Sequence, residues 1–106
     1  MNVGSSASTD DADVDIVATG DSNTITVNEN STATMLLTDK KVTSITAIGS
    51  SNTITSTHLG AGDMDTTLHH TGSSGTFAIT QDGANDGTVD IITVGSGHAV
   101  TVTVDD

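Results

Sequence analysis

The chain has 106 residues and a net charge of −12, and it contains one aromatic residue, Phe77, and no cysteine or proline. This composition excludes disulfides and a core of large interdigitating side chains, and the length favours a single domain. Only two lysines oppose 14 acidic residues, which excludes nucleic acid and anionic membranes as partners because binding to phosphate needs cationic side chains. Such a balance suits a marine or halophilic source, where salt screens repulsion between the charges.

Residues 1–10 are a polar N-terminal arm for which the sequence predicts no regular structure. The arm has neither the basic start nor the apolar stretch of a secretory signal. We therefore expect a protein that is made and assembled inside a cell, with a removed signal peptide as the alternative.

Two strand-like alternations follow the arm, one on each side of a turn. Val14 and Ile16 alternate with aspartates in the first, and Ile25 and Val27 alternate with threonines in the second. A period of two is the pattern of a half-buried β-strand. The second strand and its turn, GDSNTITV, begin at Gly20 and return from Gly49 onward as GSSNTITS.

Residues 35–48, MLLTDKKVTSITAI, lie between these two copies. The spacing between the copies is six residues longer than the regular period found further along the chain. We interpret them as a lateral insertion in which a turn over residues 38–41 joins two strands. A tolerated loop insertion and a docking element for a partner are the two interpretations of this segment. The candidate docking residues are Met35, Leu36, Leu37, Lys40 and Lys41.

The rest of the chain repeats with a regular period, which the even spacing of Gly49, Gly72 and Gly95 defines, and further glycines divide each repeat into two nearly equal halves. Glycine supplies the backbone freedom that tight turns need. The glycines of this ladder are Gly20, Gly49, Gly60, Gly72, Gly83 and Gly95. The alternation after each turn predicts a core made of Val14, Ile16, Ile25, Val27, Ile54, Leu68, Phe77, Ile79, Val89, Ile91, Val100 and Val102.

These repeats predict an all-β fold over residues 11–106, a two-sheet β-solenoid of about four 23-residue coils. Coils stacked about 4.8 Å apart give a stack roughly 20 Å tall. The first strand is of the longer type and the last is of the shorter type, so head-to-tail stacking of copies would continue the solenoid. A symmetric trimer of side-packed solenoids is the competing assembly.

The repeat resembles the curlin repeat of curli-type fibre subunits, which carries a Gln, a Gly two places on and an Asn three further on. The best match is FAITQDGANDGTVDIITVGSGH, residues 77–98, where Gln81 and Gly83 fit and Asp86 takes the place of the Asn. The resemblance covers residues 49–106 well and residues 11–30 weakly. It implies a β-solenoid that assembles into fibres. The Gln positions of the five half-repeats read Ala47, His58, His70, Gln81 and Thr93.

No motif predicts an enzyme or a cofactor, because no nucleophile has a base beside it and no phosphate loop is present. We interpret His58, His69, His70 and His98 as polar residues that flank turns. The segment GAGDMDTTL resembles one copy of a calcium-binding nonapeptide, with Asp63 and Asp65 as candidate oxygen ligands. An acidic turn without metal explains the same residues.

Threonines fill the outward positions of the shorter strands and form a candidate interaction face. Strand propensity alone explains threonine at these positions. The face is also similar to the threonine arrays of ice-binding β-solenoids, and sheet-to-sheet packing is a third use for it. The face consists of Thr24, Thr26, Thr53, Thr55, Thr76, Thr101 and Thr103.

The sequence as a whole predicts a structural, non-enzymatic protein whose main partner is itself. The first expectation is a virion surface component, such as a capsid decoration, fibre or tail protein, with other virion proteins as further partners. The alternatives are a secreted, extracellular curli-like fibre or biofilm subunit and an ice-binding protein that uses the threonine array.

Overall fold

The computed structural model describes residues 2–3, 12–30, 40–60, 62–83 and 86–105, and every regular element within them is a β-strand. Thr, Val and Ile recur along these strands, and their branched side chains favour extended backbone. The predicted all-β fold with two sheets is confirmed. The strands are β1 (Asn2–Val3), β2 (Ala12–Thr19), β3 (Thr24–Asn30), β4 (Lys40–Ile48), β5 (Thr53–Leu59), β6 (Asp63–Thr71), β7 (Thr76–Asp82), β8 (Asp86–Val94) and β9 (Ala99–Asp105).

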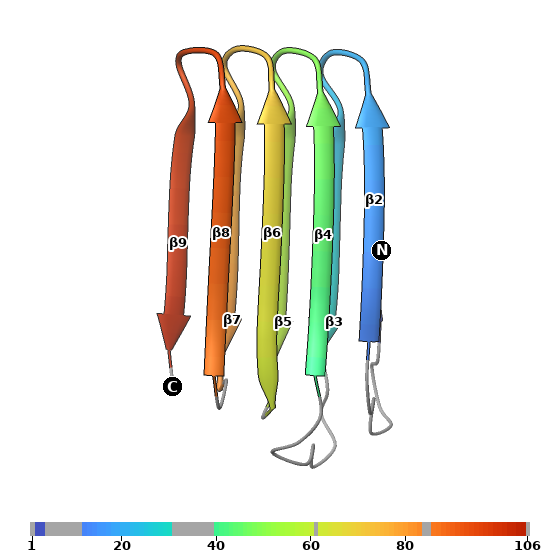
Figure 1. Cartoon of the computed structure of the whole chain (residues 1–106), viewed down its shortest axis with the longest axis vertical. Helices are drawn as coiled ribbons and strands as arrows, with labels where there is room; N and C mark the ends of the chain where they lie inside the picture. Colours follow the sequence, from blue (N-terminus) through green and yellow to red (C-terminus); the bar gives the residue numbers. More distant parts are fainter. Residues whose placement is uncertain (1, 4–11, 31–39, 61, 84–85, 106) are drawn as a thin grey trace.

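The chain alternates between two parallel sheets (Figure 1). Sheet A has the order β1-β3-β5-β7-β9, and sheet B has the order β2-β4-β6-β8. A long strand of sheet B, a four-residue turn and a short strand of sheet A together form one β-arch. Arches 1 to 4 span residues 12–30, 40–59, 63–82 and 86–105. Their turns line up at one end of a molecule that measures 40 × 21 × 15 Å.

Equivalent residues of successive arches pair in register, so they form columns across each sheet. Ile54 pairs with Phe77, and Phe77 pairs with Val100, so each partner lies one full repeat further along the chain. Arches 1 and 2 are displaced by more than one repeat, as the pair of Ile16 and Ile45 shows. The six surplus residues therefore fall between β3 and β4, where residues 31–39 lie outside the described part of the chain.

The predicted lateral insertion over residues 35–48 differs from the structure in its second half. Residues 40–48 form β4, which lies between β2 and β6 in sheet B and alternates between buried and partly exposed side chains. Lys40 and Lys41 begin this strand instead of forming a turn. Met35, Leu36 and Leu37 lie outside the described residues. Most of the predicted arm does too, but Asn2 and Val3 form β1 and pair with Asn28 and Glu29 of β3.

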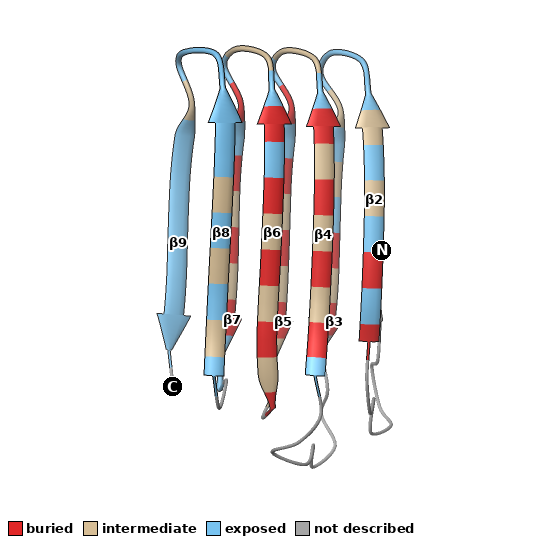
Figure 2. Cartoon of the chain, in the orientation of Figure 1, coloured by how far each residue is buried: buried red, intermediate tan, exposed pale blue. Residues whose placement is uncertain are grey.

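The core lies between the two sheets. It combines side chains of sheet B, such as Val14, Ile45 and Leu68, with side chains of sheet A, such as Ile54 and Phe77. Figure 2 shows that buried residues gather in the inner arches, whereas the strands of arch 4 are mostly exposed. Burial at the column positions is therefore lost at arch 4, whereas arch 1, at the other end, still buries Val14, Val27 and Glu29.

The predicted core residues divide according to their arch. Val14, Val27, Ile54, Leu68, Phe77 and Ile79 are buried, and Ile16, Ile25, Val89 and Ile91 are half-buried. Val100 and Val102 were predicted as core but are exposed, because no strand of the described chain covers the outer edge of arch 4. They pair with Phe77 and Ile79 of β7, so their side chains lie on the same, core-facing side of sheet A.

The four turns share one backbone conformation. Each begins with a glycine of positive φ, and the third residue has φ near 60°, as in Ser22, Ser51 and Ser74. A Cβ on Gly49 would overlap the carbonyl oxygen of Gly20 in the preceding arch, and a Cβ on Gly72 would overlap that of Gly49. The glycines thus allow successive turns to approach closely as well as to bend.

Candidate interaction surfaces

The turns are joined by hydrogen bonds that run from one arch to the next. Gly20 N–H donates to the carbonyl of Ile48 at 2.8 Å, and Ser22 N–H donates to that of Ser50 at 2.8 Å. In the opposite direction, Thr53 N–H donates to the carbonyl of Asn23 at 2.8 Å. The same pattern recurs between arches 2 and 3 and between arches 3 and 4.

The fourth residue of a turn adds a side-chain acceptor to this ladder. Asn52 Oδ1 accepts the N–H of Asn23 at 2.9 Å, and His98 Nδ1 accepts the N–H of Gly75 at 3.2 Å. In both cases, the side chain of the later arch accepts from the backbone of the earlier one. Asn23 is the equivalent residue of arch 1, where the described chain has no earlier arch.

Arch 4 leaves one edge of each sheet open. Val100, Val102 and Val104 are 45–48% exposed, whereas Phe77 and Ile79, the partners of the first two in arch 3, are 1% exposed. The edge also carries the backbone N–H and C=O groups of β8 and β9 on the side away from β6 and β7. Such an edge is a template for pairing with another strand.

Arch 1 forms the opposite end of the stack. β2 is an edge strand of sheet B, and in sheet A only Asn28 and Glu29 of β3 are covered, by β1. Ile16 and Ile25 are half-buried at this end. Both ends of the stack therefore expose apolar side chains of the core columns.

The outward face of sheet A carries the predicted threonine face. One column contains Thr24, Thr53 and Thr76, and the parallel register places the remaining predicted threonines in two further columns. Thr57 and Thr80 join the column that ends at Thr103. These three columns contain no charged residue. Threonine face is used below for the set Thr24, Thr26, Thr53, Thr55, Thr57, Thr76, Thr80, Thr101 and Thr103.

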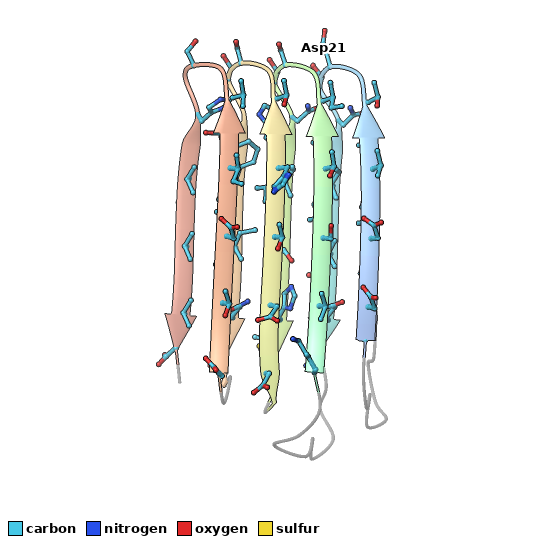
Figure 3. The ribbon with its side chains drawn as sticks, in the orientation of Figure 1. Asp21 is labelled. Carbon is cyan, nitrogen blue, oxygen red and sulfur yellow. The ribbon has the colours of Figure 1, made fainter. Side chains whose placement is uncertain are left out.

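The outward face of sheet B is divided into two halves. Val17, Ile48, Ile92 and Val94, between 46% and 70% exposed, lie in the half near the turns. The other half carries carboxylates, which include Asp13, Asp15, Asp63, Asp65, Asp86 and Asp90. Figure 3 shows Asp21 projecting from the turn of arch 1, where its Oδ1 accepts the N–H of Ser50 at 2.6 Å. Outward carboxylates are therefore concentrated on sheet B, and sheet A carries Asp82 and Asp105 at the end away from the turns.

A buried polar column runs through the core of sheet A. Glu29, His58 and Gln81 are stacked in register and fully buried. His58 Nδ1 lies 3.0 Å from Glu29 Oε2, and His58 Nε2 lies 2.8 Å from Ser56 Oγ. Gln81 Nε2 donates to the carbonyl of Met64 at 2.9 Å. These contacts favour one particular register, because a shifted strand would break them, while Glu29 Oε1 and Gln81 Oε1 accept no hydrogen bond in this column.

The positions expected for His58 and Lys41 differ from the structure, since His58, interpreted as a polar residue that flanks a turn, is fully buried in β5. Lys41 is 1% exposed, and its Nζ donates to the carbonyl of Leu59 at 2.6 Å, so it is not available for docking. Along β4, Lys41 falls on the same inward-facing side of the strand as Thr43 and Ile45. Along β3, Glu29 falls on the same side as Ile25 and Val27. This alternation is the sequence signal that would have identified Lys41 and Glu29 as buried.

The candidate calcium ligands lie on the outward side of β6. Asp65 Oδ2 forms an ion pair with Lys40 Nζ at 2.6 Å. The hydrogen bond to Asp65 is the largest of the effects that raise the pKa of Lys40 above its ordinary value of 10.5. Within the described residues, no three His, Asp or Glu side chains gather closely enough to hold a metal ion.

His70 belongs to a second buried cluster beside the turns. Its ring lies 4.9 Å from that of Phe77 and 5.0 Å from that of His98, measured between centroids, and its Nε2 lies 3.4 Å from Asn52 Nδ2. Burial lowers the pKa of His70 below its ordinary value of 6.5, the charge of His98 lowers it further, and the carbonyl of Gly49 opposes the shift. His70 pairs with Ala47 and Thr93, and the exposed His69 beside it faces outward.

No pocket is found in the part of the chain that the structure describes. The described residues also form no helix with the length and apolar character needed to cross a membrane. No protein family, curated protein or solved structure matches the chain with significant similarity.

Proposed function

We propose that the protein is a structural, non-enzymatic component that assembles by contacts between copies of itself. The observation that carries this proposal is the exposure of Val100, Val102 and Val104 at 45–48%, in columns that are buried one arch earlier. Open edges and half-exposed core columns favour association, because pairing buries apolar area and satisfies backbone groups together.

The proposed fold of the assembled protein is a β-solenoid in which the four arches are successive coils. Arches 3 and 4 are each displaced in register by one full repeat from the arch before them, which supports it. Repeats of this kind contact only their neighbours, so each coil is stabilised by the next one. A stack of coils is extended by adding another coil at its end.

The first biological setting that we propose is a virion surface, where the protein would serve as a capsid decoration, fibre or tail component. An acidic chain that self-associates without cationic patches for nucleic acid or membranes suits that role. The alternative setting is a secreted fibre or biofilm subunit, which the resemblance to curlin repeats favours. Neighbouring genes separate these settings: capsid or tail genes support the first, and secretion and nucleation genes support the second.

Sedimentation velocity over a wide range of protein concentrations tests self-association. We expect the mean mass to rise with concentration in moderate salt, and we expect Val102→Asp to abolish the rise because it places a charge in the end column. Ile48→Asp, at an equally exposed apolar residue on the outward face of the inner strand β4, is the matched control. A wild-type chain that stays single at the highest concentration refutes the proposal, and loss of association in Ile48→Asp alone would favour side-packed solenoids.

The threonine face supports ice binding as a second candidate function. Its three regular columns present methyl and hydroxyl groups and contain no charged residue, in a protein of net charge −12. Thermal hysteresis of the purified protein is the test, with Thr55→Tyr as the disrupting variant. A solution without hysteresis, or hysteresis that Thr55→Tyr leaves unchanged, removes this candidate.

A further inference from the structure

The arches show how one end of the molecule would fit the other. Within the chain, the later arch always places its turn glycine over the carbonyl of the preceding turn glycine, as Gly49 does on Gly20 and Gly95 does on Gly72. The position of a Cβ on Gly20 is open, because the nearest heavy atom is Asn23 Nδ2 at 3.7 Å. Arch 1 thus has the geometry of the later arches, and the place that a preceding arch would take in front of its turn is open.

We propose that arch 1 of a second copy docks on arch 4 in the register that joins arches within the chain, with polarity fixed by the turns. This inference rests on the proposed self-association and specifies its interface. In this register, Gly20 of the second copy covers the carbonyl of Gly95. The main-chain bonds of the turn ladder continue, so Gly95 N–H donates to the carbonyl of Thr19 in the second copy.

The side-chain acceptors of the turns fit the same register. Asn52 accepts from Asn23, and His98 accepts from Gly75, each from the preceding arch. Asn23 of the second copy is therefore placed to accept the N–H of His98 with its Oδ1. Its Nδ2 already donates to the carbonyl of Gly20 at 2.6 Å, which holds the amide in the orientation that Asn52 adopts.

The apolar columns also match across this junction. Val100 and Val102 would lie on Ile25 and Val27 of the second copy, and Ile91 would lie on Ile16. Val100 and Val102 are exposed and Ile16, Ile25 and Ile91 are half-buried, so these side chains would meet apolar partners across the junction, whereas Val27 is already buried in the single chain. Association in the opposite polarity would not continue the parallel pairing found in both sheets.

The junction requires β1 to leave its place. β1 pairs Asn2 with Asn28 and Val3 with Glu29, and the same register would place Thr103 and Val104 of the first copy on those two residues. β1 and the β9 strand of a neighbour therefore compete for one edge of β3. Deletion of residues 1–3, which removes β1 from that edge, is expected to lower the protein concentration needed for assembly severalfold.

The junction also brings two carboxylates together. Asp90 pairs with Thr67, which pairs with Ser44, which pairs with Asp15, so Asp90 would lie beside Asp15 of the second copy. Like charges on opposed strands are unfavourable, and salt screens them. We expect assembly to strengthen with salt, and Asp90→Asn to reduce that dependence.

Disulfide cross-linking tests the register directly, because the native chain contains no cysteine. Thr101 would lie opposite Thr26 of the second copy, within the spacing that a disulfide spans. We expect a mixture of Thr101→Cys and Thr26→Cys chains to form a cross-linked pair under mild oxidation, and neither variant to cross-link alone. The mixture of Thr101→Cys and Thr24→Cys is the control with the register shifted by two residues.

The outcomes separate this interface from self-association in general. Multimers in sedimentation without the Thr101–Thr26 cross-link, or with cross-linking of Thr101→Cys to itself, overturn the interface and leave self-association standing. A chain that remains single at all concentrations overturns both. Gly20→Ala supplies a second readout: a folded variant by circular dichroism that no longer assembles supports the contact with Gly95, and unimpaired assembly contradicts it.

Discussion

Glu29 Oε2 lies 3.0 Å from His58 Nδ1, and neither side chain is exposed to solvent. His58 also contacts Ser56 and Thr66 through Nε2, at 2.8 and 3.3 Å. A buried acid–base pair is stabilised by each partner, but it also requires desolvation of both. The pair therefore fixes the register of β3 against β5 more than it adds to the total stability.

Removing one member of this pair is expected to be costly, and removing both is expected to be much less so. His58→Leu or Glu29→Leu alone should lower the free energy of unfolding by about 3–5 kcal/mol, because the other group stays buried without its partner. The double variant should lose clearly less than the sum of the two losses. Urea denaturation followed by far-ultraviolet circular dichroism measures this, since the chain has no Trp or Tyr.

His69→Leu is the control for a histidine that faces outward, and we expect it to leave the unfolding midpoint nearly unchanged. Losses in the double variant that simply add would show that Glu29 and His58 act independently.

The adjacent lysines give a second prediction. Lys41→Ala should lower the free energy of unfolding by about 2–4 kcal/mol, because it empties a buried site and leaves the carbonyl of Leu59 without its donor. Lys40→Ala removes the half-exposed ion pair with Asp65 and should leave the protein near wild-type stability. Chemical denaturation of both variants measures the difference. Equal effects would contradict the buried position of Lys41.

The sequence pattern was sufficient to predict both sheets, since the alternation around Ile54, Leu68 and Phe77 is the same in the structure. It was not sufficient to predict burial at the ends, because Val100 has the same parity as Phe77 and differs only in lacking a neighbour. Lys41 was predicted to lie in the turn over residues 38–41 of the insertion. It instead begins β4, and the strand parity that it shares with Ile45 places it inside.

The stability of the protein is expected to fall as the pH decreases below about 6.5, the ordinary pKa of histidine. The folded state lowers the pKa of His70, so between the folded and unfolded pKa values the unfolded chain binds more protons. Stability from this group is therefore complete above the unfolded pKa and declines with acidification, by at most about 1.4 kcal/mol per pH unit, down to the folded pKa. Thermal denaturation from pH 8 to pH 5 measures the slope.

His70→Thr should flatten this slope, because Thr93 occupies the same column in arch 4. His69→Thr, beside it on the outward face, should leave the slope as in the wild type. A slope that persists in His70→Thr would show that the pH dependence does not come from His70.

The close approach of successive turns gives the last prediction. Gly72→Ala places a Cβ against the carbonyl of Gly49, at a residue whose φ is 148°. Gly20→Ala introduces the same side chain at a similar φ of 123°, but its nearest neighbour is Asn23 Nδ2 at 3.7 Å. Because both variants carry the backbone cost of positive φ, the difference between them isolates the contact between arches. We expect Gly72→Ala to lose about 1–3 kcal/mol more than Gly20→Ala in chemical denaturation of dilute, single chains. Equal losses would mean that the turns separate easily and that backbone conformation alone selects glycine at these positions.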